Sequence, residues 1–158
     1  MKSLLLIIAC TTLSASADWG PSPLKSMVEH SNCIVVAGFE SELSKSNSPE
    51  RTDQTASLKV ISVIKGEAPE TIVVTGYVDT RLCKAQYVFP TIKDTSYLLF
   101  LCKSENTYSV VNGPFGALTI TDNKVTWFTD ETKMQSMTER KPVDLETAIA
   151  AIKSAISP

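Results

Sequence analysis

The chain has 158 residues, with 15 lysines and arginines against 17 aspartates and glutamates, a net charge of −2 and 43% hydrophobic residues. This length suits one domain that buries a hydrophobic core without depending on disulfides. The charged residues are spread along the chain and form no basic patch, which argues against nucleic acid as a partner.

Residues 1–17 have the three parts of a secretory signal peptide: Lys2 at the start, an apolar run at residues 4–13, and Ala-Ser-Ala at 15–17. They predict that the mature protein starts at Asp18, that residues 18–158 form one domain, and that this domain is secreted or periplasmic. The apolar run is too short to cross a bilayer, so no transmembrane segment is expected. An alternative is a lipid anchor at Cys10, but it leaves too short a signal and is weaker.

The first half of the mature chain reads as a short helix followed by strands. Leu24, Met27 and Val28 fall on one face of a helix over residues 24–30. Apolar, β-branched runs predict three strands, and the polar stretch between the first two predicts a long surface loop. These segments are residues 33–40 (strand), 41–55 (loop), 58–64 (strand) and 70–76 (strand).

The second half continues with strands until residue 128. Pro90 interrupts residues 77–95, which are expected to form an irregular connector. Residues 96–102 form the most clearly buried strand, and a turn leads from it into a strand at residues 107–111. A turn at residues 112–116 precedes a small hairpin, 117–121 with 124–128, around Asp122-Asn123.

The C-terminal segment changes to a helical period. An apolar stripe predicts a helix that docks on the sheet, with Asp144 at its N-terminus. The stripe consists of Leu145, Ile149, Ile152 and Ile156. Binding of this helix to a membrane surface is the weaker alternative, because Lys153 is its one lysine.

The order of these elements is similar to that of small secreted bacterial proteins related to the netrin-like and tissue-inhibitor-of-metalloproteinases superfamily. Four segments carry the resemblance: residues 33–40, 58–66, 70–74 and 97–101. The resemblance implies a mainly β fold, an OB-fold-like antiparallel barrel over about residues 24–111, with the later hairpin and the two helices added to it. A β-sandwich of the same strands is the structural alternative.

The resemblance stops short of the superfamily's best-known activity. Its animal inhibitors bind the zinc of a protease through a cysteine at the mature N-terminus, whereas this chain is expected to start Asp18-Trp19-Gly20. No residue here matches that cysteine. Other members are non-catalytic binding modules, and the resemblance implies such a role for this chain.

No catalytic residue, cofactor site or metal site is predicted. The sole histidine, His30, ends the first helix, where a positive charge suits the helix dipole. Zinc-site spacing and a Gly-x-Ser-x-Gly elbow are missing, and residues 113–116 read as a turn and not as a phosphate loop. The carboxylate pairs Asp130–Glu131 and Glu40–Glu42 are interpreted as solvated surface charge.

Three cysteines remain after cleavage, which predicts one disulfide and one free thiol in an oxidising compartment. All three pairings of Cys33, Cys83 and Cys102 stay open from the sequence. In the OB-like barrel that the resemblance implies, the first strand runs antiparallel to the fourth, which favours Cys33 with Cys102.

Two aromatic residues are predicted to lie on a binding surface. Trp127 and Phe128 are adjacent, so in a strand they point to opposite faces and one of the two is expected to be exposed. Trp127 and Tyr108 are the candidates for the binding surface. The leading functional hypothesis is an exported, non-catalytic domain that binds a protein or a cell-envelope component. The alternatives are a secreted protease inhibitor and a hydrolase that uses carboxylates alone.

Overall fold

The structure is a computed structural model that describes residues 22–82, 84–127 and 141–156. Its elements follow in chain order: α1 (Leu24–His30), β1 (Cys33–Asn47), β2 (Arg51–Lys65), β3 (Thr71–Asp79), β4 (Lys84–Ala85), β5 (Ser96–Ser104), β6 (Thr107–Val110), the 3₁₀ helix η1 (Gly113–Phe115), β7 (Ala117–Thr121), β8 (Lys124–Trp127), β9 (Lys141–Asp144) and α2 (Leu145–Ile156). Within these ranges, no helix is long and apolar enough to cross a membrane.

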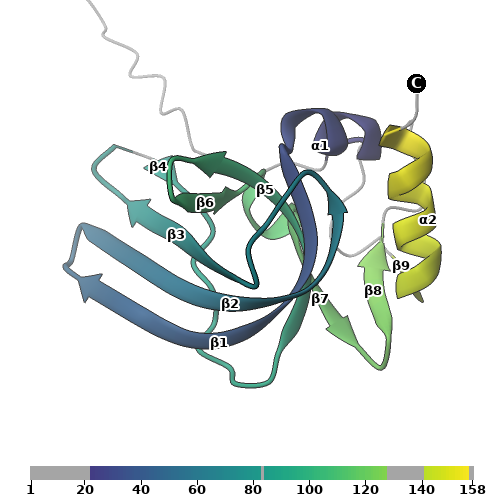
Figure 1. The fold of residues 1–158 in the computed structure, drawn as a ribbon. Helices are drawn as coiled ribbons and strands as arrows, with labels where there is room; N and C mark the ends of the chain where they lie inside the picture. The colour runs from purple at the N-terminus through teal and green to yellow at the C-terminus, as the bar shows by residue number, and fades with distance from the viewer. Residues whose placement is uncertain (1–21, 83, 128–140, 157–158) are drawn as a thin grey trace, which may run out of the picture.

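Five strands close into a barrel (Figure 1). They are ordered β1-β2-β3-β6-β5, and β5 returns to pair with β1. Neighbouring strands are antiparallel except for β3 and β6, which are parallel. This order is that of an OB-fold, so the predicted fold class is confirmed. The expected antiparallel pairing of the first strand with the fourth is the β1–β5 pair.

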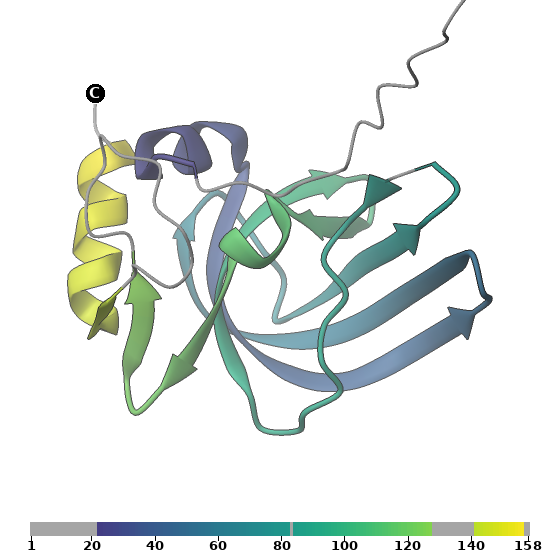
Figure 2. The same ribbon diagram turned by 180° about the vertical axis from the view of Figure 1, so that it is seen from behind.

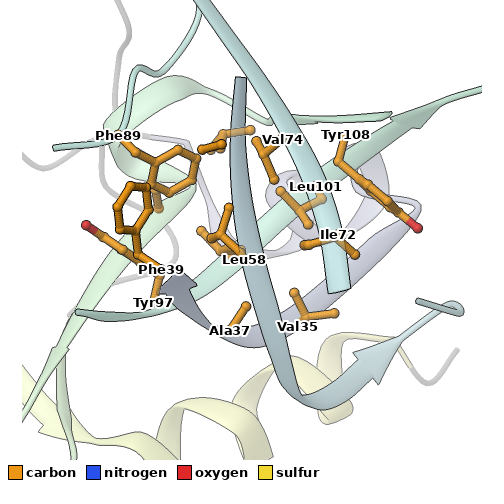
Figure 3. Packing of buried hydrophobic residues seen from close by; sticks show 14 of the residues in the cluster. Val35, Ala37, Phe39, Leu58, Ile72, Val74, Phe89, Tyr97, Leu101 and Tyr108 are labelled. Atoms are coloured by element: carbon orange, nitrogen blue, oxygen red, sulfur yellow. The ribbon is translucent and has the colours of Figure 1, made fainter. Parts of the chain in front are cut away.

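Residues 33–39 of β1 and 97–101 of β5 pack on both faces of the sheet and separate two hydrophobic clusters. Val35 and Leu99 point into the barrel, where Figure 3 shows the side chains converging from several strands. Ile34 and Phe100 point the other way, into a cluster that includes residues of both helices. A strand buried on both faces reads as a continuous apolar run, which is why residues 96–102 gave the clearest strand signal.

Both predicted helices form over the expected residues. Leu24, Met27 and Val28 of α1 are buried, and α2 begins at Leu145, directly after Asp144. Figure 2 shows the two helices together at one end of the molecule, away from the long arm formed by β1 and β2. Ile152 is fully buried in the second cluster, which confirms that α2 docks on the sheet.

The surface loop predicted for residues 41–55 is wrong. β1 and β2 continue through this segment as one antiparallel hairpin, whose last pair is Asn47 with Thr52. Apart from Leu43, the exposed side chains of this arm are polar, so it has few of the apolar residues that would mark a strand. Short strands β4 and β9 were not predicted either, and β9 pairs with β8.

The connector between β4 and β5 packs closely on the barrel. Phe89 is buried against the rings of Phe39 and Tyr97, at centroid distances of 6.3 and 5.2 Å (Figure 3). The side-chain amide of Gln54 donates to the carbonyl of Phe89 at 2.9 Å and accepts from its N–H at 2.6 Å. A buried glutamine thus satisfies backbone groups that no strand pairs, and it fixes the connector in place.

Candidate functional site

The densest polar cluster among the described residues lies where the β1–β2 arm ends beside the end of β3 (Figure 1). We call it the Asp79 rim. It consists of the side chains of Glu50, Arg51, Asp53, Asp79 and Arg81. The backbone joins the two turns as well, because Thr80 donates from its N–H to the carbonyl of Glu50 at 2.9 Å.

Asp79 is the centre of the rim. Its side chain is only 1% exposed and accepts hydrogen bonds from five donors: Nη1 of Arg51, Nε and Nη2 of Arg81, and the backbone N–H groups of Arg81 and Leu82. The hydrogen bond from Arg81, followed by that from Arg51, lowers the pKa of Asp79 from 3.8 to about 2. The carboxylate therefore holds the turn after β3 in one conformation.

Arg51 joins the two strands. Its guanidinium binds both carboxylate oxygens of Asp53, at 2.7 and 2.6 Å, and lies 5.1 Å above the ring centre of Tyr77. The hydrogen bonds to Asp53 and Asp79 raise the pKa of Arg51, and the bond from Arg51 lowers the pKa of Asp53. A bidentate pair stacked on an aromatic ring fixes the guanidinium plane.

We expect the free energy of unfolding to decrease in acid, because Asp79 loses its charge there. The folded-state pKa of Asp79 is about 2 and its ordinary value is 3.8, so the unfolded chain takes up a proton first as the pH falls. The stabilisation by Asp79 is complete above about pH 4 and disappears as the pH falls from about 4 to 2. Urea midpoints measured from pH 7 to pH 2 should fall over this window. Asp79→Asn should be less stable than the native chain at pH 7 and should flatten this decline, and an unchanged decline would contradict the role of Asp79.

This geometry does not suit acid–base chemistry. Both rim aspartates are held ionised by arginine, so neither keeps the proton that a general acid needs at neutral pH. Glu40 and Glu42, which the sequence analysis interpreted as surface charge, each accept a hydrogen bond from a different side chain, Ser57 at 2.9 Å and Gln54 at 2.7 Å. The other pair, at residues 130–131, lies outside the described residues.

His30 lies at the end of α1, where its ring contacts a backbone carbonyl. His30 is the last residue of α1, as expected, and its Nδ1 lies 2.7 Å from the carbonyl of Ser26. Within the described ranges, no group of three histidine, cysteine, aspartate or glutamate residues is placed to hold a metal ion. Residues 113–115 form a single 3₁₀ turn closed by i→i+3 hydrogen bonds, so the turn predicted at residues 113–116 is confirmed.

The predicted disulfide between Cys33 and Cys102 is not formed in the structure, where both thiols are free. The strand pairing behind the prediction is present, but Cys33 lies opposite Leu101. Cys102 is one residue further along β5, so the two side chains point to opposite faces of the sheet: Cys33 is buried in the barrel and Cys102 is exposed. Cys83 lies outside the described residues.

Thiol labelling separates the two arrangements. In residues 18–158 with Cys83→Ser, we expect Cys102 to react quickly with an alkylating reagent and Cys33 to react only after unfolding, because burial raises the pKa of Cys33. Mass spectrometry before and after denaturation counts the labels. A chain that takes up no label until a reductant is added would show that the disulfide forms.

The two predicted surface aromatics have different outcomes. The prediction that Tyr108 lies on the surface is wrong, because its side chain is 3% exposed and belongs to the cluster inside the barrel (Figure 3). Successive side chains of β6 alternate between the two faces of the sheet, and Tyr108 occupies an inward position. The backbone of Trp127 ends β8 and pairs with Lys141. The side chain of Trp127 lies outside the described part of the structure, so its exposure stays a prediction.

The sequence prediction also missed the rim. Its residues fall in the segment interpreted as a loop and in the irregular connector. The available signal was a short alternation just after this segment of β2, where the apolar Ala56 and Leu58 are buried and alternate with the polar Thr55 and Ser57. The partner Asp79 had no such signal, since it lies 28 residues beyond Arg51.

With the fold and the rim defined, the molecule is described as an OB-fold-like barrel with an added hairpin and two helices. A scan of protein-family models and searches of curated proteins and of solved structures find no match to this chain. The relation to the netrin-like superfamily therefore stays a prediction.

Proposed function

We propose that this chain is an exported, non-catalytic domain that binds a protein or a cell-envelope component through the Asp79 rim. The observation that carries this proposal is the five-donor fixation of Asp79, which sets the shape of the exposed turn after β3 before any partner arrives. A surface that is already ordered loses little conformational entropy on binding, so more of its contact energy becomes affinity.

The rim also presents an apolar anchor. Leu82 is 59% exposed, although its backbone N–H is tied to Asp79. Arg81, its neighbour in the sequence, pairs with Glu50 at 3.3 Å, and both charged side chains are more than half exposed. An apolar side chain on a fixed backbone, with charged groups next to it, resembles on a small scale the apolar core and polar rim of a protein interface.

The polar environment supports binding rather than turnover. Each carboxylate of the rim is paired with arginine, and the histidine binds a backbone carbonyl far along the chain from the rim. These features disfavour the carboxylate-only hydrolase within the described residues.

A secreted protease inhibitor is the second candidate, and the fixed turn favours it. Inhibitors of proteases present a rigid edge to the active site, and residues 80–82 form such an edge. Stoichiometric inhibition of any enzyme in a panel of purified serine, cysteine and zinc proteases, lost in Leu82→Asp, would support this candidate. Cleavage of the chain without inhibition would reject it.

The binding proposal is tested by capture from the envelope fraction of the producing cell, with partners identified by mass spectrometry. Leu82→Asp should reduce recovery of a specific partner by at least about ten-fold, the effect of losing a hot-spot residue. Ile92→Asp is the matched control, because Ile92 is also 59% exposed but lies outside the rim. Equal loss in both variants, or in neither, would contradict the rim as the binding surface.

Two further proposals accompany this one. Export requires cleavage before Asp18, and N-terminal sequencing of the extracytoplasmic protein tests it; a lipid-modified Cys10 as the first residue would overturn it.

If Trp127 contributes to the surface, Trp127→Ala should weaken partner capture with little change in melting temperature. A buried tryptophan would instead cost about 3–5 kcal/mol of stability.

A further inference from the structure

The sheet of the arm, made by β1, β2 and β3, has one face that no described segment covers. Gln54 and Ala56 of β2 are buried on the inner face, where the amide of Gln54 binds the connector at Phe89. Figure 2 shows this connector crossing the arm, whereas Figure 1 shows the opposite face with no described segment in front of it. The residues that alternate with Gln54 and Ala56 therefore lie on an open sheet face.

Three rows of three residues, one from each strand, make up the middle of this open face. Residues directly opposite each other in neighbouring strands share a face, so the register of the strands defines each row. Seven of the nine positions, all except Asp53 and Val73, carry a hydroxyl group, and we call this surface the hydroxyl face. In the order β1, β2, β3 its rows are Ser46–Asp53–Tyr77, Ser44–Thr55–Thr75 and Ser41–Ser57–Val73.

Most of these hydroxyl groups are open to a ligand. Ser57 donates to Oε2 of Glu40 at 2.9 Å, and Thr75 donates to the carbonyl of Tyr108 at 3.4 Å. The hydroxyl groups of the other five residues make no hydrogen bond within residues 22–82, 84–127 and 141–156. Each hydroxyl group can both donate and accept, so the face offers both functions on strands about 4.8 Å apart.

The charges on and around the hydroxyl face cancel. Arg51 binds Asp53 through two hydrogen bonds, and Glu40 and Lys59 lie at the other end of the face, so two positive charges stand against two negative ones. A polyanion needs a positive surface, which this face lacks. A protein hot spot needs aromatic or apolar anchors, whereas the ring of Tyr77 is stacked against Arg51 at 5.1 Å.

We propose that the hydroxyl face binds a linear, uncharged polysaccharide. Such a chain carries hydroxyl groups that donate and accept as those of serine and threonine do, and it meets no unpaired charge on this face. It lies flat across the three strands and makes hydrogen bonds to Ser44, Thr55 and their neighbours. Short side chains on paired strands lose little conformational entropy when they bind, so these hydrogen bonds add up to a measurable affinity.

This inference goes beyond the rim and does not rest on it. The hydroxyl face adjoins the Asp79 rim, because Arg51 and Asp53 belong to both surfaces. The binding proposed for the rim depends on the turn after β3 and on Leu82, whereas polysaccharide binding uses the hydroxyl groups of the three rows. Each proposal can therefore fail without the other.

The experiment titrates ¹⁵N-labelled residues 18–158 with chitohexaose and with cellohexaose, two uncharged oligomers with flat β-1,4-linked chains. At least one of them should shift the backbone amide signals of Ser44, Thr55 and Thr75 saturably. The amide signals of Val36 and Leu118, which belong to the cluster beneath the helices, should not move. Maltohexaose, whose α-linked chain is curved, and an acidic hexamer of galacturonic acid are the control probes, and both should bind more weakly.

Two variants locate the binding on the hydroxyl face. Thr55→Val removes the central hydroxyl group and should weaken binding about five-fold, as for one lost hydrogen bond. Thr52→Val is the matched control, because Thr52 lies in the same strand on the other face, opposite Asn47 and Val78, and it should bind like the native chain. The amide spectrum of each variant shows that it is folded.

Three results would overturn the proposal: no saturable shift with either uncharged β-1,4-linked oligomer, tighter binding of the acidic hexamer, or equal binding by Thr55→Val and Thr52→Val. The titration contains no protein partner, so none of these results would count against capture through Leu82. Loss of partner capture in Leu82→Asp, in turn, says nothing about the hydroxyl groups of β1, β2 and β3.

Discussion

Alanine at Leu99 or at Phe100 is expected to destabilise the protein strongly, by about 2–5 kcal/mol for Leu99 and about 3–5 kcal/mol for Phe100. Both side chains are fully buried, although they are neighbours in β5 and point to opposite faces. Leu99 contributes to the cluster inside the barrel, and Phe100 to the cluster beneath the helices. Each truncation leaves a cavity in a different core, since close-packed surroundings relax only in part.

Urea denaturation followed by circular dichroism measures both effects. Cys102→Ser is the control in the same strand, and it should change the free energy of unfolding by no more than about 0.5 kcal/mol because Cys102 is exposed. If one of the two alanine variants were as stable as the control, one face of β5 would not be a core. A stable Phe100→Ala variant would contradict the packing of α1 and α2 on the outside of the barrel, and a stable Leu99→Ala variant would contradict the packing inside it.

Gly76→Ala is expected to be the second most damaging change, with a cost of about 1–3 kcal/mol or more from overpacking. A Cβ at this position would lie 2.0 Å from the carbonyl oxygen of Tyr87 and 2.8 Å from its carbonyl carbon. Because both atoms belong to the backbone, the connector itself has to move. Its displacement would disturb the bonds between Gln54 and Phe89 and the packing of the Phe89 ring.

Gly38→Ala is the matched control for this effect. Gly38 also lies in a barrel strand, but its added Cβ would meet Oγ of Ser96 at 3.8 Å and Cδ1 of Ile61 at 4.0 Å, which are ordinary contacts. This variant should be neutral or more stable by about 0.4–1 kcal/mol, since alanine reduces the entropy of the unfolded chain. Thermal unfolding of both variants provides the comparison. Equal stability would show that the connector does not press on β3.

Local patterns were sufficient for most of the elements. The helical spacing of Leu24, Met27 and Val28 located α1, and the turn around Asp122-Asn123 located the β7–β8 hairpin. These signals act between residues close in sequence, where backbone preference and side-chain spacing leave little choice. The same reasoning failed for residues 41–55, because an arm with a polar outward face lacks the apolar content of a core strand.

The orientation of side chains within the barrel required the three-dimensional arrangement. Cys33 and Cys102 do lie on neighbouring strands, but a one-residue offset in register places them on opposite faces. Tyr108 was predicted to lie on the surface because tyrosine is common in binding surfaces, but it is buried because its position in β6 points into the barrel. The amino-acid composition of a segment indicates that it forms a strand. The register of that strand against its neighbours determines which face of the sheet each side chain lies on.

The amino-acid pattern was therefore enough to establish a mainly β chain with a helix at each end, since strand and helix periods are local properties. It also indicated the OB-like order of strands through a resemblance. The candidate site depended on folding, because Asp79 meets Arg51 only when β2 and β3 pair in register. The hydroxyl face likewise places Ser44 and Thr75 in one row, 31 positions apart in the sequence, and no periodicity along a chain records such an arrangement.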